Sequence, residues 1–129
     1  MEDWLSSHIK GCEFAEMKQA GINLVRLPLG YWNLIDMPGN PNAPSHDAER
    51  MGRLSKIMKA ADYRKYIDMV THYAATLDMK VYFDLHGAPG GQNGATYSGC
   101  VLHKDNDKSA YWDTPWNKKW TLAAFKEMA

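Results

Sequence analysis

Residues 80–94, KVYFDLHGAPGGQNG, decide how the rest of the chain is interpreted. Residues 81–85 form a mostly apolar run, and a polar, glycine-rich loop follows from His86. A short run of this kind, bounded by Gly and Pro, is typical of a buried strand. Because parallel α/β proteins bind ligands where their strands end, we expect the ligand to bind at this junction.

Helices and strands alternate around this stretch. The apolar spacing predicts an α/β fold with parallel strands joined by helical crossovers. The expected helices cover residues 12–20, 62–77 and 116–128, with Gly21 just past the first and Asp62 as the cap of the second. The expected strands cover residues 22–27, where Pro28 ends the pairing, and residues 81–85.

The connections between these elements differ in length. One or two residues join each helix to the next strand, whereas roughly thirty residues follow each strand, and loops of that length are usually functional. We expect their aromatic rings to form a rim suited to stacking on sugar faces. The rings are those of Tyr31, Trp32, Tyr97, Tyr111 and Trp112.

The composition excludes several classes of protein. Acidic and basic residues balance at 15 each, so the chain lacks the basic excess that a nucleic-acid or anionic-membrane surface requires. No apolar run approaches the roughly 20 residues of a membrane span, and residues 1–20 do not resemble a signal peptide. Cys12 and Cys100 are too few for a disulfide scaffold and could pair or stay free. We therefore expect neither a nucleic-acid nor a membrane partner.

Alternation along the strands selects the candidate site residues. Asp84 and His86 share one face of the second strand, and Arg26 points to the same side from the first. A charge inside an apolar strand needs a carboxylate or several hydrogen-bond acceptors. Arg26 and His86 are therefore candidate site residues, and a structural ion pair of Arg26 with Asp84 or another buried acid is the alternative. Asp84 either orients a neighbouring cation or is a satisfied core carboxylate.

The glycine-rich loop lacks the features of other common sites. A phosphate-binding loop needs a Lys-Ser or Lys-Thr pair and an immediate helix, and neither follows here. Cys100 and His103 have the spacing of half a zinc site but no second ligand pair. No Ser stands in a Gly-x-Ser-x-Gly elbow. The sequence therefore predicts neither a metal nor a cofactor.

Two motifs lie in order along the chain, INLVRLPLGYW at residues 22–32 and VYFDLHGAPGGQNG at residues 81–94. Together they resemble glycoside hydrolase family 5, in its exo-β-1,3-glucanase-like branch. The family pattern is Arg-x-Pro-x-Gly-Tyr-Trp at a strand end, then Asp-Leu-His-Gly-Ala-Pro-Gly-x-Gln-Asn-Gly. The resemblance implies an N-terminal fragment of a (β/α)8 barrel. Residues 1–129 would form a single incomplete domain, roughly from helix 1 through helix 3 with two parallel strands.

The same resemblance implies a retaining hydrolase that acts on β-glucan, above all β-1,3-glucan, outside the cell or in the cell wall. Arg26 would hold the nucleophilic carboxylate, and His86 would bind the sugar next to the cleaved bond. Tyr31 and Asn93 would shape the glucose pocket. The implied substrate-binding residues are Tyr31, Trp32, Gln92 and Asn93.

The chain departs from the family in its carboxylates. Retaining glycosidases need two carboxyl groups about 5–5.5 Å apart, and in this family both are Glu, on the fourth and seventh strands. The first belongs to an Asn-Glu pair, and no such pair occurs here. A complete barrel takes about 250 residues and eight strands. We therefore interpret the chain as the second and third βα units with part of the first, without catalytic residues and inactive alone.

Two other functions stay open at this point. A non-catalytic carbohydrate-binding remnant would use the aromatic rings of Tyr31, Trp32, Tyr111 and Trp112. An unrelated α/β domain that binds another small molecule would place Arg26 and His86 far apart.

Overall fold

The computed structural model describes residues 10–38, 60–93 and 112–129. The predicted order of helices and strands is confirmed, with a short 3-10 turn, η1, after the first strand. The elements are α2 (Gly11–Gln19), β1 (Leu24–Gly30), η1 (Tyr31–Asn33), α4 (Ala60–Thr76), β2 (Lys80–Gly87) and α5 (Pro115–Met128). Asp62 therefore lies inside α4 rather than at its cap. Most of both long loops, including Tyr97, Tyr111, Cys100 and His103, lies outside the described residues.

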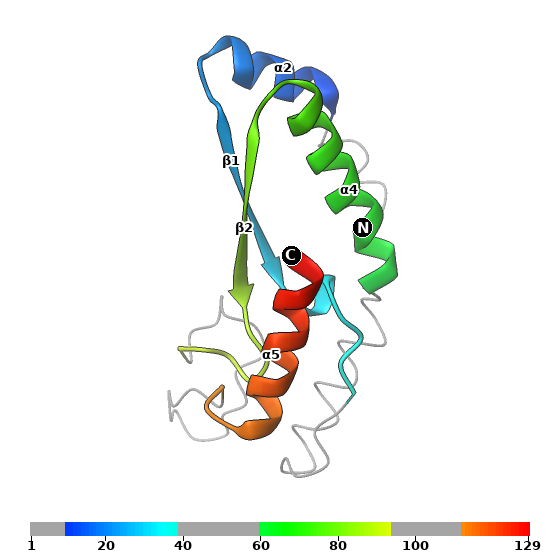
Figure 1. The fold of residues 1–129 in the computed structure, drawn as a ribbon, viewed down its shortest axis with the longest axis vertical. Coiled ribbons are helices and arrows are strands. Elements are labelled where there is room, and N and C mark those ends of the chain that lie inside the picture. Colours follow the sequence, from blue (N-terminus) through cyan, green and yellow to red (C-terminus); the bar gives the residue numbers. More distant parts are fainter. Residues whose placement is uncertain (1–9, 39–59, 94–111) are drawn as a thin grey trace.

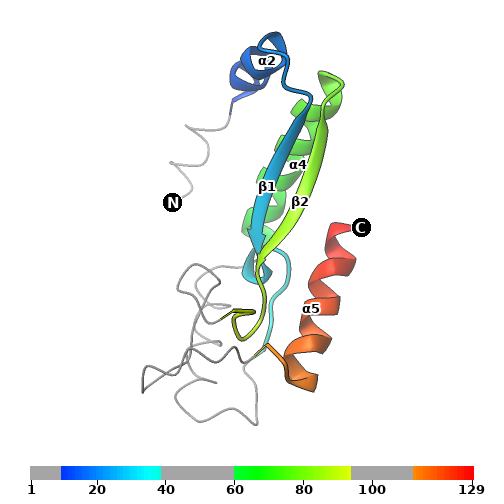
Figure 2. The same ribbon diagram turned by 90° about the vertical axis from the view of Figure 1, so that its left-hand side faces the viewer.

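β1 and β2 form a two-stranded parallel sheet, as the alternation of elements predicted (Figure 1). Val25 pairs with Val81, and Leu27 pairs with Phe83. These apolar side chains share the face of the sheet that packs against the helices. Figure 2 shows α4 running along that face.

The prediction that Pro28 ends the first strand is wrong, because β1 runs on to Gly30 and Pro28 pairs with Asp84. The carbonyl of Asn23 accepts from the N–H of Lys80 at 2.8 Å. In a parallel ladder the N–H and C=O groups of every second residue face the partner strand. Asn23 faces β2, so Pro28, five positions later, faces away from it. Its missing N–H lies on the edge of β1 that faces away from β2, where the ladder loses no bond.

α2 and α4 end in the same kind of turn, which explains the short links to the strands. Gly21 and Asp78 adopt left-handed backbone conformations, with φ of 86° and 50°. The N–H of the next residue bonds to a carbonyl five residues back, at 3.0 and 2.8 Å, which is the Schellman arrangement. Lys18 of α2 also donates from Nζ to the carbonyl of Asp78 at 2.8 Å. The starts of both strands are thereby held close together.

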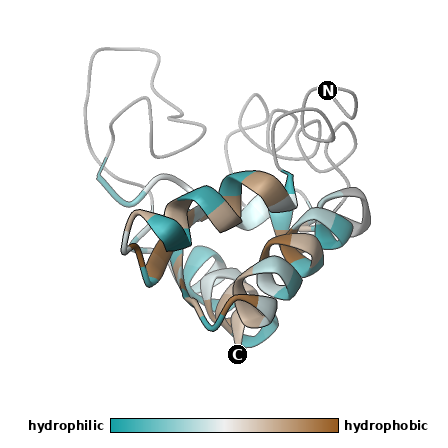
Figure 3. Cartoon of the chain, turned by 90° about the horizontal axis from the view of Figure 1, so that it is seen from above, coloured by the Kyte–Doolittle hydropathy of each residue, from teal (hydrophilic) through white to brown (hydrophobic). Residues whose placement is uncertain are grey.

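Two hydrophobic clusters lie along the covered face of the sheet. Helix residues four positions apart contribute to them because they lie on one helical face. In Figure 3 hydrophobic and hydrophilic residues accordingly alternate along the helices. The first cluster has buried Phe14, Val70, Ala74 and Met79. The second has buried Leu29, Tyr31, Leu34, Met37 and Ala124.

α5 covers the carboxyl-terminal half of the sheet (Figure 1). It begins at Pro115 behind Thr114, whose Oγ1 accepts from the N–H of Asn117 at 3.2 Å. Trp112 donates from Nε1 to Oγ1 of Thr121 at 3.0 Å, which fixes the segment before the helix against it. An ion pair between Arg64 and Glu127 joins α4 to α5.

The other face of the sheet is open in the part of the chain that the structure describes. Leu24 is 51% exposed and Tyr82 is 57% exposed. We call this the open face, and it consists of Leu24, Arg26, Pro28, Tyr82 and Asp84. An Arg and an Asp therefore lie between exposed apolar residues on one side of the sheet.

Candidate functional site

A one-residue irregularity marks the carboxyl end of the sheet. Leu29 pairs with Leu85, but Gly30 pairs with Gly87, so His86 is an extra residue in β2. Such β-bulges are rare in parallel pairs, and they redirect side chains next to active sites. Sequence reasoning missed the bulge. The glycine directly after His86 is the one signal that could have indicated it.

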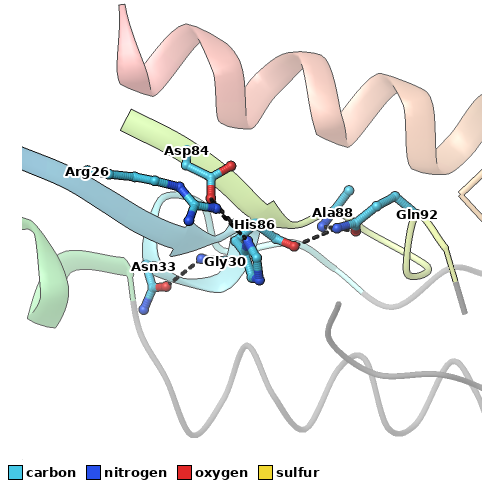
Figure 4. Close-up of polar contacts among 7 residues, drawn as sticks. All are labelled: Arg26, Gly30, Asn33, Asp84, His86, Ala88 and Gln92. Atoms are coloured by element: carbon cyan, nitrogen blue, oxygen red, sulfur yellow. Dashed lines mark hydrogen bonds and ion pairs between the residues drawn. The ribbon is translucent and has the colours of Figure 1, made fainter. Parts of the chain in front are cut away.

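Three charged or polar side chains meet on the open face (Figure 4). Arg26 donates from Nη2 to Oδ2 of Asp84 at 2.6 Å. His86 Nδ1 lies 3.0 Å from the same oxygen and 3.4 Å from Arg26 Nη2. The side chain of Asp84 is 21% exposed, against 57% for Arg26 and 43% for His86. The structure thus brings the two candidate residues together around one carboxylate, which the unrelated-domain hypothesis did not expect.

The exposure of this ion pair leads to a stability prediction. We expect Arg26→Met to lower the free energy of unfolding by less than about 1 kcal/mol, because an exposed pair is screened by water. Arg64→Met is the matched control, since Arg64 is similarly exposed, at 58%, in its pair with Glu127. Urea denaturation of both variants gives the comparison. A loss of several kcal/mol for Arg26→Met alone would mean that the pair holds the sheet together.

The loop after β2 is braced by its own residues. In residues 88–91, APGG, the N–H of Gly91 donates to the carbonyl of Ala88 at 3.0 Å, and Gly90 has φ of 79°. A Pro followed by a left-handed Gly is typical of a type II turn. Gln92 accepts from the N–H of Ala88 at 2.9 Å and donates from Nε2 to the carbonyl of His86 at 2.5 Å. Its amide therefore holds the loop beside His86.

Trp32 lies on two glycines at the end of the sheet. A Cβ on Gly30 would stand 2.2 Å from the Trp32 ring, and a Cβ on Gly87 would stand 2.7 Å from it. The Gly-Tyr-Trp segment of the first motif and the His-Gly segment of the second therefore both need a glycine, because a Cβ there would collide with the Trp32 ring. The N–H of Gly30 also donates to Oδ1 of Asn33 at 2.8 Å, which fixes the start of η1.

Tyr31 lies in the core rather than on an exposed aromatic rim. It is 1% exposed, and its ring meets that of Trp32 edge-on, with centroids 5.1 Å apart. Asn93 is exposed at the end of the described loop. The substrate contacts expected of Tyr31, Trp32, Gln92 and Asn93 stay predictions.

The described residues include a free thiol but neither a metal-binding cluster nor a membrane-spanning helix. Residues 10–38, 60–93 and 112–129 contain no group of three or more His, Cys, Asp or Glu side chains arranged to hold a metal ion. Cys12 is an exposed, free thiol. Across the same ranges, no helix combines the length and the apolar character needed to cross a membrane.

No family model matches the chain, but individual proteins do. It is 39% identical over 87 residues to a glucan 1,3-beta-glucosidase from Blumeria graminis, a match that covers 67% of this chain and 16% of that protein. A probable glucan 1,3-beta-glucosidase A from Aspergillus niger is 37% identical over 94 residues, 73% of this chain and 18% of that protein. Glucan 1,3-beta-glucosidase 2 from Candida albicans is 33% identical over 99 residues, 77% of this chain and 17% of that protein.

A solved structure matches the fold over nearly the whole chain. The crystal structure of rutinosidase from Aspergillus niger has a TM-score of 0.67 and 20% identity, and the match covers 93% of this chain and 28% of that one. At this identity the likeness shows the fold alone. The chain spans only 16–18% of the length of the curated relatives above. It is a homologue of one segment of the glucan 1,3-beta-glucosidases, in the glycoside hydrolase family 5 that its two motifs resemble.

Proposed function

We propose that this chain is part of a retaining glycoside hydrolase that cleaves β-glucan, with β-1,3-glucan as its main substrate. The observation that carries the proposal is the meeting of Arg26 and His86 around Asp84, on adjacent parallel strands. The carboxyl ends of such strands are where α/β barrels bind substrate. Homology to glucan 1,3-beta-glucosidases supplies the substrate class.

The open face supports a place in a (β/α)8 barrel. In such a barrel one face of each strand contacts helices and the other faces the barrel interior. Here the helices cover one face only, and Arg26 and Asp84 lie on the other. We infer that residues 1–129 contribute two neighbouring βα units to one incomplete barrel domain, and that the open face turns toward the substrate.

The positions of the carboxylates indicate which roles this chain can have in catalysis. Retention requires two carboxyl groups about 5–5.5 Å apart. Glu13, Glu16 and Glu127 all lie on helices, and no Asn-Glu pair occurs in the sequence. We infer that the catalytic pair belongs to other strands of the barrel. Arg26 would donate to the nucleophilic carboxylate, an interaction that charge-assisted hydrogen bonds make strong. His86 would contact the sugar.

A two-part experiment tests this function. The isolated chain is incubated with laminarin, a β-1,3-glucan, and released glucose is measured. We expect none. The aligned part of this chain is then put in place of the matching segment of the Aspergillus niger relative, an alignment of 94 residues. This chimera is expected to release glucose. Glucose release by the isolated chain, or a folded chimera without activity, would contradict the proposal.

An Arg26 variant of the chimera tests whether this residue acts at the site. In the chimera, Arg26→Met should lower kcat/KM at least about 100-fold, because removing one preorganised donor costs roughly 10²–10³ in rate. Arg64→Met removes an Arg of similar exposure on the far side of the sheet and should leave kcat/KM unchanged. Equal activities for the two variants would argue against a role for Arg26 at the site.

The alternative of a carbohydrate-binding remnant finds less support. It needs exposed aromatic rings, but Tyr31 is buried and Trp32 packs on Gly30 and Gly87.

A β-glucan substrate would also place the protein outside the cell or in the cell wall, and we propose that location.

A further inference from the structure

One carboxylate oxygen organises both candidate residues of the site. Oδ2 of Asp84 contacts Arg26 Nη2 at 2.6 Å and His86 Nδ1 at 3.0 Å. Asp84 is also the least exposed of the three side chains, at 21%. The bulge adds His86 to β2 as an extra residue two positions after Asp84, within reach of that oxygen (Figure 4). The arrangement therefore centres on Asp84.

We propose that Asp84 is a positioning residue that fixes the protonation pattern of the His86 ring. A carboxylate oxygen can only accept a hydrogen bond, so the nitrogen that faces it must carry the proton. Nδ1 of His86 is then the donor to Asp84. In a neutral imidazole one nitrogen donates and the other accepts, so Nε2 is left as the acceptor.

The Arg26 geometry agrees with this assignment. In the opposite tautomer, Nδ1 would present a lone pair to the carboxylate and accept from Arg26 instead. Arg26 Nη2 lies 3.4 Å from Nδ1 but only 2.6 Å from Oδ2 of Asp84. The guanidinium N–H is therefore directed at the carboxylate, and the carboxylate also accepts a hydrogen bond from Nδ1–H.

The assignment deepens the proposed function, on which its consequence for substrate rests. Arg26 is held in a fixed direction by the same oxygen. The same carboxylate would thus orient both residues that the proposed function places at the substrate.

The experiment reads the tautomer directly in the isolated chain. Long-range ¹H–¹⁵N correlation spectra of the imidazole rings, recorded under alkaline conditions, distinguish Nδ1–H from Nε2–H rings. His86→Gln assigns the His86 signals by their loss, and exposed His72 serves as the internal reference. We expect His86 in the Nδ1–H form and His72 in the Nε2–H form that imidazoles ordinarily favour.

Variants of Asp84 then test the cause. Asp84→Ala should convert most of the His86 population to Nε2–H. Asp84→Asn keeps an acceptor oxygen of the same reach and should retain part of the Nδ1–H population. Asp68→Ala removes an exposed carboxylate on α4 and should change nothing. Since the tautomer is read in the unmodified chain and His86→Gln only assigns its signals, the proposal is testable even where an Asp84 substitution prevents folding.

The outcomes separate this proposal from the proposed function. An Nε2–H ring for His86 in the unmodified chain, or an Nδ1–H ring that persists in folded Asp84→Ala, overturns the role of Asp84. An Nδ1–H ring in the unmodified chain that becomes mostly Nε2–H in folded Asp84→Ala supports the role of Asp84, even if the chimera fails to release glucose. In that case only the hydrolase assignment is lost.

Discussion

Gly87→Val will expel the Trp32 ring from the end of the sheet and lower the free energy of unfolding by about 3 kcal/mol or more, the upper range for overpacking. A Cβ at position 87 would stand 2.7 and 3.0 Å from two atoms of the Trp32 ring and 3.5 Å from the Cα of Gly30. Valine has a high preference for strands, so the loss must come from this collision. Urea denaturation measures it.

Two further variants make the cause specific. Lys80→Val places the same residue at an exposed position of the same strand and should cost nothing measurable. Trp32→Ala removes the ring that the valine meets, so the double variant should lose less stability than the sum of the two single variants. Strictly additive losses would show that Gly87 is needed for its backbone rather than for the space that it leaves.

Phe14→Ala should lower the free energy of unfolding by about 3–5 kcal/mol, the usual cost of truncating a buried phenylalanine. Phe14 is the buried residue of α2, at 5% exposure, and its ring centroid lies 5.7 Å from that of Tyr73 on α4. Its loss removes the main apolar contact of α2 with the first cluster. Urea denaturation again gives the free energy.

Phe125→Ala is the matched control, because Phe125 is 51% exposed on α5. Surface truncations of this kind usually change stability by within about 0.5 kcal/mol. If both phenylalanines cost the same, the packing of α2 on α4 contributes little to the fold.

The faces of the strands could be predicted from sequence because they depend on a period of two. That rule correctly put Val25 and Leu27 on the covered side and Arg26 on the other. Gly21 was also found from local chemistry, since a left-handed residue at a helix end favours glycine. Each of these features is set by residues that are near one another in the chain.

The errors arose where distant residues decide. Whether Pro28 interrupts the ladder depends on which edge β2 occupies, and β2 comes more than fifty positions later. The bulge at His86 accompanies the packing of Trp32 on Gly30 and Gly87. Tyr31 belongs to a loop by its local sequence but shares a cluster with Ala124 of α5. No local pattern contains these contacts.

The role of Asp84 also could not be decided from local sequence. The sequence allowed it to orient a cation or to be a satisfied core carboxylate, and both descriptions fit its position in the strand. Only the contacts show that one oxygen serves Arg26 and His86 together.

The parallel pairing of β1 with β2 also has a consequence for biosynthesis. Arg26 and Asp84 are 58 positions apart in the chain. At translation rates of about 5–20 residues per second, Arg26 is made roughly 3–12 seconds before Asp84. During that interval β1 has neither its strand partner nor its counter-charge, so the nascent chain presents an apolar strand with an unpaired arginine. The apolar residues of β1 therefore stay without their partner strand on the ribosome until β2 has been made.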